Sequence, residues 1–119
     1  MNPASVYKDC AIETQSRGKI VVMLYDGAIN FLRHAIDEVE SQNFESKGQY
    51  IGRAQDIINE LNTVLDMEIG GEIAQNLRSL YLFMTKHLNE ANIESSPQKI
   101  QEVIDLLEEL NRGWKAIAE

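Results

Sequence analysis

The sequence predicts an all-α protein, an antiparallel up-down four-helix bundle with a short N-terminal segment. Apolar residues recur at spacings of three and four along four long segments, the spacing of one helical face. Proline occurs only at positions 3 and 97, so no proline interrupts these segments. No segment alternates apolar and polar residues with the period of a half-buried strand. A chain of 119 residues suits one domain with one hydrophobic core.

Residues 1–15 form a lead segment that precedes the bundle, which we place at residues 16–119. Pro3 suits the first position of a helix. The segment is too short to be helical alone. One of its faces carries three small or aromatic residues, Ala4, Tyr7 and Ala11. We expect the segment to be either mobile or docked on the bundle through Tyr7.

The first bundle helix is predicted from about Ser16, as N-cap, to about Ser41, and the second starts after Asn43 and runs to about Leu65. Short connections between helices of this length favour antiparallel neighbours. The expected core positions of the first helix are Val21, Leu24, Ala28, Phe31, Ala35 and Val39. Those of the second are Ile51, Ala54, Ile58, Leu61 and Leu65.

The other two helices are separated by clear breaks in the pattern. Gly70-Gly71 interrupts the chain before a helix over residues 72–92, and Ser96 can cap a last helix that begins at Pro97. The third helix is expected to bury Ile73, Leu77, Leu80, Met84, Leu88 and Ala91. The fourth is expected to bury Ile100, Val103, Leu107, Leu110, Trp114 and Ile117.

Three of the helices carry more apolar surface than a bundle core requires. A bundle helix needs an apolar stripe of about 100° or somewhat more, whereas the two stripes of the first helix together cover roughly 200°. Such flanks either pack against neighbouring helices or form grooves for another helix. For the second case we predict partner contacts by Tyr7, Val22, Tyr25, Ile29, Tyr50, Ile57, Val64, Leu82 and Phe83.

Motifs for catalysis or cofactor binding are not found in the sequence. A carboxylate-bridged metal bundle would need Glu three residues before a histidine, but Phe31 precedes His34 and Met84 precedes His87 at that distance. No glycine-rich phosphate-binding motif and no nucleophile-elbow motif occurs. We therefore predict no catalytic residue, no cofactor and no metal, and so not an enzyme.

The charge balance and the single cysteine narrow the partners and the compartment. The net charge of −8 disfavours nucleic acid and anionic membrane surfaces as partners. Cys10 has no second cysteine in the chain with which to form a disulfide, which fits a reducing compartment. The first residues lack the pattern of a signal peptide, and no apolar run is long enough to span a membrane. We expect a cytoplasmic protein that is monomeric or weakly self-associating.

Several motifs together resemble the FliS family of flagellin-specific export chaperones, from residue 2 to about residue 117. The first-helix signature of that family is similar to Val21-Val22-Met23-Leu24-Tyr25-Asp26-Gly27-Ala28-Ile29. Its second-helix signature is similar to Ala54-Gln55-Asp56-Ile57-Ile58-Asn59-Glu60-Leu61-Asn62. The turn and third helix resemble Leu65-Asp66-Met67 with Gly70-Gly71-Glu72-Ile73-Ala74-Gln75-Asn76-Leu77. One position departs from the family, which often has proline where Arg17 stands.

The resemblance implies a cytosolic chaperone that binds the disordered C-terminal region of flagellin. Such a chaperone would prevent premature polymerisation and keep flagellin competent for flagellar type III protein export. The resemblance also implies a link to the flagellar export gate. An N-terminal segment that lies over a surface used by flagellin is a further implication.

A second hypothesis is a self-associating structural bundle without a flagellin client. It would use the same apolar flanks as a dimer interface. Solution size and binding to a flagellin C-terminal peptide distinguish the two hypotheses.

Overall fold

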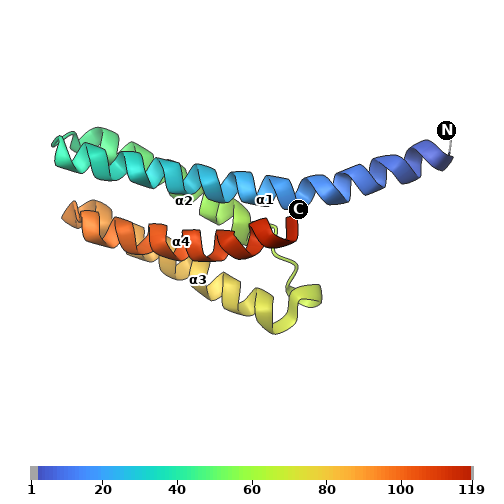
Figure 1. Cartoon of the computed structure of the whole chain (residues 1–119). Coiled ribbons are helices and arrows are strands. Elements are labelled where there is room, and N and C mark those ends of the chain that lie inside the picture. The colour runs from blue at the N-terminus through green and yellow to red at the C-terminus, as the bar shows by residue number, and fades with distance from the viewer. Residues whose placement is uncertain (1–2, 119) are drawn as a thin grey trace.

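The computed structural model describes residues 3–118, and their side chains from residue 17 onward. It contains four helices, α1 (Pro3–Glu40), α2 (Phe44–Thr63), α3 (Met67–Glu94) and α4 (Pro97–Ala118), and residues 3–118 include no strand. The predicted all-α bundle is therefore confirmed. α1 packs against α2 and α4, and α3 packs against the same two helices, so α1 and α3 lie diagonally opposite (Figure 1).

The first helix begins at Pro3, so its predicted start at Ser16 is wrong. Pro3 can occupy the first helical position, and the residues that follow include no helix breaker until Gly18. A single glycine inside a helix costs only about 1 kcal/mol, which the packing of the later turns can offset. Figure 1 shows the first turns of α1 extending past the C-terminal end of α4. Docking of Tyr7 stays a prediction, because its side chain lies outside the described residues.

The buried stripe of α1 is rotated relative to the predicted one. Ala28 and Ala35 are buried as predicted, but the other buried apolar positions are Tyr25, Ile29 and Leu32. α1 packs between α2 and α4 and faces α3 across the diagonal. Its most buried residues therefore lie on the side that faces the centre of the bundle, between α2 and α4. The expected core residues at the stripe's edge are half-buried and pack on the core, namely Val21, Leu24, Phe31 and Val39.

The predicted core stripes of the other helices are confirmed along most of their length. The buried residues include Ile51, Ala54, Ile58 and Leu61 of α2, Met84, Leu88 and Ala91 of α3, and Ile100, Val103 and Leu107 of α4. Ile73 and Ile117 are 72% and 73% exposed, so their assignment to the core is wrong. Both lie at the end of the bundle where the N-terminal half of α3 diverges from α4 (Figure 1). We call this the open end.

The predicted interruption at Gly71 and the predicted helix start at Pro97 are present, but α3 begins at Met67, so its predicted start at residue 72 is wrong. Gly71 interrupts α3 with φ 53° and ψ −128°, a conformation that glycine adopts at no steric cost. Pro97 begins α4, and the backbone N–H of Lys99 donates to the Ser96 hydroxyl at 3.2 Å. The predicted N-cap is therefore confirmed.

The opposite end, where the α1–α2 and α3–α4 turns lie, is held by a buried lysine. Lys47 on α2 is 6% exposed, and its Nζ donates to the Asn92 carbonyl at 2.8 Å and to Ser95 Oγ at 3.0 Å. A cation beside the C-terminal carbonyls of a helix is favourable because of the helix dipole. Lys47 thus ties the start of α2 to the end of α3, and we call this the closed end.

Candidate partner-binding surface

Two of the predicted partner-binding residues are in the core. Tyr25 and Ile29 are buried in the same cluster as the central residues of the other helices. The prediction that they lie on an exposed flank is wrong, because the spacing of apolar residues does not determine which side of α1 faces the core. In this structure Tyr25 is fully buried, and Ile29 is only 4% exposed.

Tyr25 makes a polar contact across the diagonal of the bundle. Its hydroxyl oxygen lies 2.6 Å from that of Tyr81 on α3, and the two share a hydrogen bond. Burial raises the pKa of both phenols. The ring of Trp114 on α4 meets the Tyr25 ring edge-on, with 6.3 Å between centroids. Tyr25 therefore connects three helices within the core.

Three other predicted residues, Val22, Tyr50 and Ile57, are half-buried. Tyr50 stacks on His34 with 5.2 Å between ring centroids, so it lies between α1 and α2. The Cδ1 atom of Ile57 lies 3.4 Å from where a Cβ on Gly27 would be, so Gly27 lets α1 and α2 approach closely. These side chains mainly pack helix on helix and offer a partner only their edges.

Val64, Leu82 and Phe83 are the predicted residues with large exposed areas, at 60%, 52% and 47%. Phe83 stacks on His87 with 5.0 Å between ring centroids. The ring of His87 in turn lies beside Glu102 of α4, with Nε2 3.6 Å from Oε1. Phe83 is therefore on the α4 side of α3, whereas Val64 caps the C-terminus of α2. The predicted residues do not gather in one patch.

Apolar side chains instead line two hollows at the open end, on opposite sides of the last turns of α4. The first, the α3–α4 hollow, has a volume of about 260 Å³. It lies where α3 diverges from α4 (Figure 1), and its two isoleucines, Ile73 and Ile117, are largely exposed. Its lining residues are Ile73, Leu77, Leu110, Gly113, Trp114 and Ile117.

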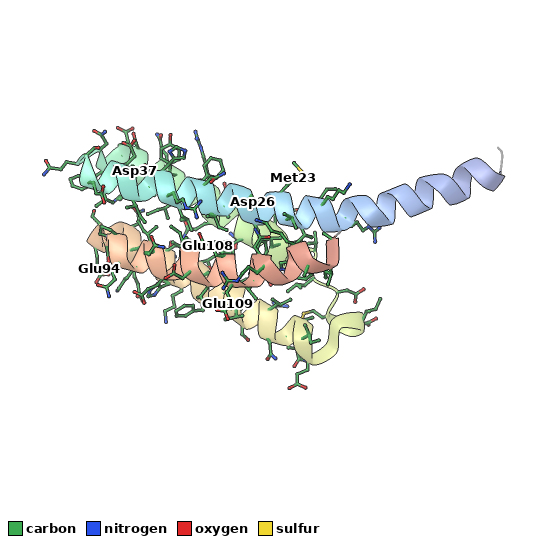
Figure 2. All side chains as sticks on the ribbon, viewed as in Figure 1. Met23, Asp26, Asp37, Glu94, Glu108 and Glu109 are labelled. Atoms are coloured by element: carbon green, nitrogen blue, oxygen red, sulfur yellow. The ribbon has the colours of Figure 1, made fainter. Side chains whose placement is uncertain are left out.

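The second, the α1–α4 hollow, has a volume of about 490 Å³ and is also mainly apolar. The end of α4 reaches α1 here, since Ala118 Cβ lies 3.3 Å from where a Cβ on Gly18 would be. Met23 projects from α1 at this end (Figure 2). The lining residues are Lys19, Val22, Met23, Lys115 and Ala118.

Sequence reasoning found Val22 but missed most of the residues in these hollows. Ile73, Leu77 and Ile117 follow the spacing of core residues, and only the divergence of α3 leaves Ile73 and Ile117 exposed. Met23 lies on neither apolar stripe of α1. Its position as a single apolar residue on the polar side of the helix is the one feature of the sequence that could have indicated its place in the α1–α4 hollow.

The two hollows at the open end are suited to binding apolar side chains. Among the side chains that the structure describes, from residue 17 to residue 118, no group of three His, Cys, Asp or Glu residues is arranged to hold a metal ion. None of the described helices is long and apolar enough to cross a membrane. Grooves beside helices that are lined by Ile, Leu, Trp and Met can receive the apolar face of another helix.

The chain matches a family model over its whole length and resembles several curated proteins. The family model is that of "Flagellar protein FliS", matched by residues 1–119. A flagellar secretion chaperone FliS from Vibrio cholerae is 38% identical over 93% of this chain and 85% of its own length. The Salmonella typhimurium protein of the same name is 38% identical, over 97% and 86%. The Bacillus subtilis protein is 31% identical, over 96% and 84%.

Proposed function

This chain belongs to the FliS family, the flagellar secretion chaperones, and on that premise we propose that it binds the C-terminal region of flagellin. Binding occurs in the cytoplasm, before export. It prevents premature polymerisation of flagellin and keeps it competent for flagellar type III secretion. The flagellar export gate is the expected second partner, to which the loaded chaperone delivers its client.

One observation carries this proposal beyond family membership, namely the pair of apolar hollows at the open end. Contiguous apolar surface on a soluble protein commonly marks an interaction site. Trp114 and Leu110 line one hollow and Val22 and Met23 the other, so two apolar segments of one client could be bound on both sides of α4. A segment that folds on binding must recover its ordering entropy from such contacts.

The net charge of −8 supports the same function. A chaperone has to expose apolar surface to its client without associating with itself. Like charges on every copy oppose that association, and the effect weakens as salt screens it.

Calorimetric titration with a synthetic peptide of the cognate flagellin's C-terminal region tests the proposal. We expect a one-to-one complex, and we expect Ile117→Asp to weaken it about tenfold or more, because an aspartate would be desolvated in the α3–α4 hollow. The control is Ile93→Asp, which changes another largely exposed isoleucine, on α3 and outside both hollows, and should bind as the wild type does. A tight dimer that ignores the peptide would instead support a self-associating structural bundle.

A further inference from the structure

A polar pocket of about 380 Å³ lies beside the α1–α4 hollow, farther along the same two helices. Figure 2 shows Asp26 of α1 and Glu108 of α4, which line it from its two sides. Lys115 lines both the pocket and the hollow, so the two are adjacent. The lining residues of the pocket are Asp26, Ile29, Asn30, Arg33, Glu108, Asn111, Arg112 and Lys115.

The carboxylate of Asp26 is held in position in this pocket. Its Oδ1 accepts a hydrogen bond of 2.8 Å from Nδ2 of Asn111, a side chain that is only 3% exposed. Lys115 Nζ lies 3.6 Å from the same oxygen. Within the part of the chain whose side chains are described, Oδ2 of Asp26 makes no hydrogen bond, and about half of the side chain is exposed. The structure thus presents an oriented acceptor to the pocket.

The charges around Asp26 select the kind of group that fits. The pocket is lined by three basic and two acidic side chains, and Arg33 and Glu108 form an ion pair between α1 and α4. Because Arg33 and Glu108 pair with each other, a cation from a partner would meet the charges of Lys115 and Arg112, and an anion would meet the charge of Asp26. A neutral group that both donates and accepts avoids either conflict. The carboxamide of Asn or Gln does so with two separate atoms.

We propose that the seam between α1 and α4 is a two-part site for a helix of flagellin. An apolar side chain of that helix occupies the α1–α4 hollow, and an Asn or Gln side chain enters the polar pocket and donates to Asp26. The inference rests on the proposed function and specifies the chemistry of the client. The two parts are separated by roughly 10 Å along the helices, or about seven residues of a client helix. Asn111 is the positioning residue for Asp26.

The test on the protein uses a double variant, Asp26→Ala with Asn111→Leu. Removing only one partner would leave the other unpaired, whereas replacing both by apolar groups is close to neutral for folding. We expect nearly unchanged thermal melting and about tenfold weaker binding of the cognate flagellin C-terminal peptide. The matched control is Asp37→Ala with Gln101→Leu, the same types of change at exposed positions of α1 and α4 outside the pocket. The control should bind like the wild type.

A second arm changes the peptide and needs no variant of the protein. Each Asn and Gln of the peptide is replaced by Leu in turn, and one replacement should weaken binding to the wild type about tenfold. The same replacement should not weaken binding to the double variant further, because the partner group is already missing.

Three outcomes overturn the inference, and they are distinguishable. If the wild type binds the peptide and the double variant binds equally well, the pocket is not used. If every Asn or Gln replacement in the peptide weakens binding to the wild type and to the double variant by the same factor, no carboxamide of the peptide binds Asp26, and that part of the inference is wrong. If the wild type does not bind the peptide at all, the proposed function fails and this inference fails with it.

Discussion

Tyr25 and Tyr81 form a hydrogen bond between two helices that do not otherwise lie side by side. Each hydroxyl is buried in an apolar cluster, so each depends on the other for its hydrogen bond. A buried polar group that loses its partner costs about 1–3 kcal/mol, whereas removing both partners of a pair is nearly neutral. The pair therefore disfavours cores in which α1 and α3 are shifted along their axes.

The first prediction concerns single and double removal of these hydroxyls. Tyr25→Phe and Tyr81→Phe should each lower the free energy of unfolding by about 1–2 kcal/mol, because each leaves one buried hydroxyl unpaired. The double variant should lose less than the sum of the two. Urea denaturation followed by circular dichroism measures all three values. Additive losses would mean that the hydroxyls do not interact.

The second prediction concerns alkaline pH. The pKa of both tyrosines in the folded protein is raised above the ordinary value of 10.0, mainly because burial disfavours the phenolate. Their contribution to stability is fully present below pH 10 and is lost as the pH rises above it, because only the unfolded chain ionises there. The free energy of unfolding should fall above pH 10, and less steeply in Tyr25→Phe with Tyr81→Phe. Equal slopes would contradict this assignment.

At the scale of elements, Gly71 determines how α3 begins. With φ at 53° and ψ at −128°, the residue separates the turn that starts at Met67 from the rest of the helix. Asp66 caps that turn by accepting from the backbone N–H groups of Glu68 at 3.1 Å and Ile69 at 2.9 Å. The open end therefore begins with a local structure that the sequence specifies by one cap and one glycine.

The third prediction follows from that backbone conformation. Gly71→Ala should lower the free energy of unfolding by about 1–3 kcal/mol, because residues with a side chain rarely adopt it. The control is Gly52→Ala in α2, where an added Cβ meets no atom within 4 Å. That change should raise stability by about 0.5–1 kcal/mol, since alanine favours helix. Thermal melting should show a lower melting temperature for Gly71→Ala and a higher one for Gly52→Ala. A melting temperature raised by Gly71→Ala would refute the argument.

Helix number, turns and most core residues followed from the sequence because each has a local cause. Ser96-Pro97 favours the start of a helix, and the glycine at position 71 favours an interruption of one. The rotation of the α1 stripe has no local cause. Val21 and Tyr25 are both apolar, and which of them is more deeply buried depends on where α2, α3 and α4 lie. The hollows at the open end depend on the divergence of α3, which is likewise a property of the assembled bundle.

At the scale of the whole molecule, α1 makes the protein long. The principal extents are 57 × 28 × 23 Å, and the radius of gyration is 16.7 Å. A compact domain of this length has a radius of gyration of about 13–14 Å. The difference arises largely from the turns of α1 that extend past α4 (Figure 1).

The fourth prediction concerns the lead segment. Deleting residues 2–12 should lower the radius of gyration in small-angle scattering and leave thermal melting nearly unchanged. If the segment covers apolar surface in part of the molecules, the deletion should tighten peptide binding, or at least not weaken it. Calorimetric titration of both forms decides the point. A large loss of affinity would mean that the segment contacts the client directly, and the cover hypothesis would be abandoned.

The contact that Lys47 makes at the closed end bears on how a client leaves. It lies at the far end of the bundle from both hollows, so under the proposed function a client that binds at the open end does not have to break its hydrogen bonds. Under the proposed function we therefore expect unloading to be a local event at the open end. A carrier built in this way would need no refolding between one client and the next.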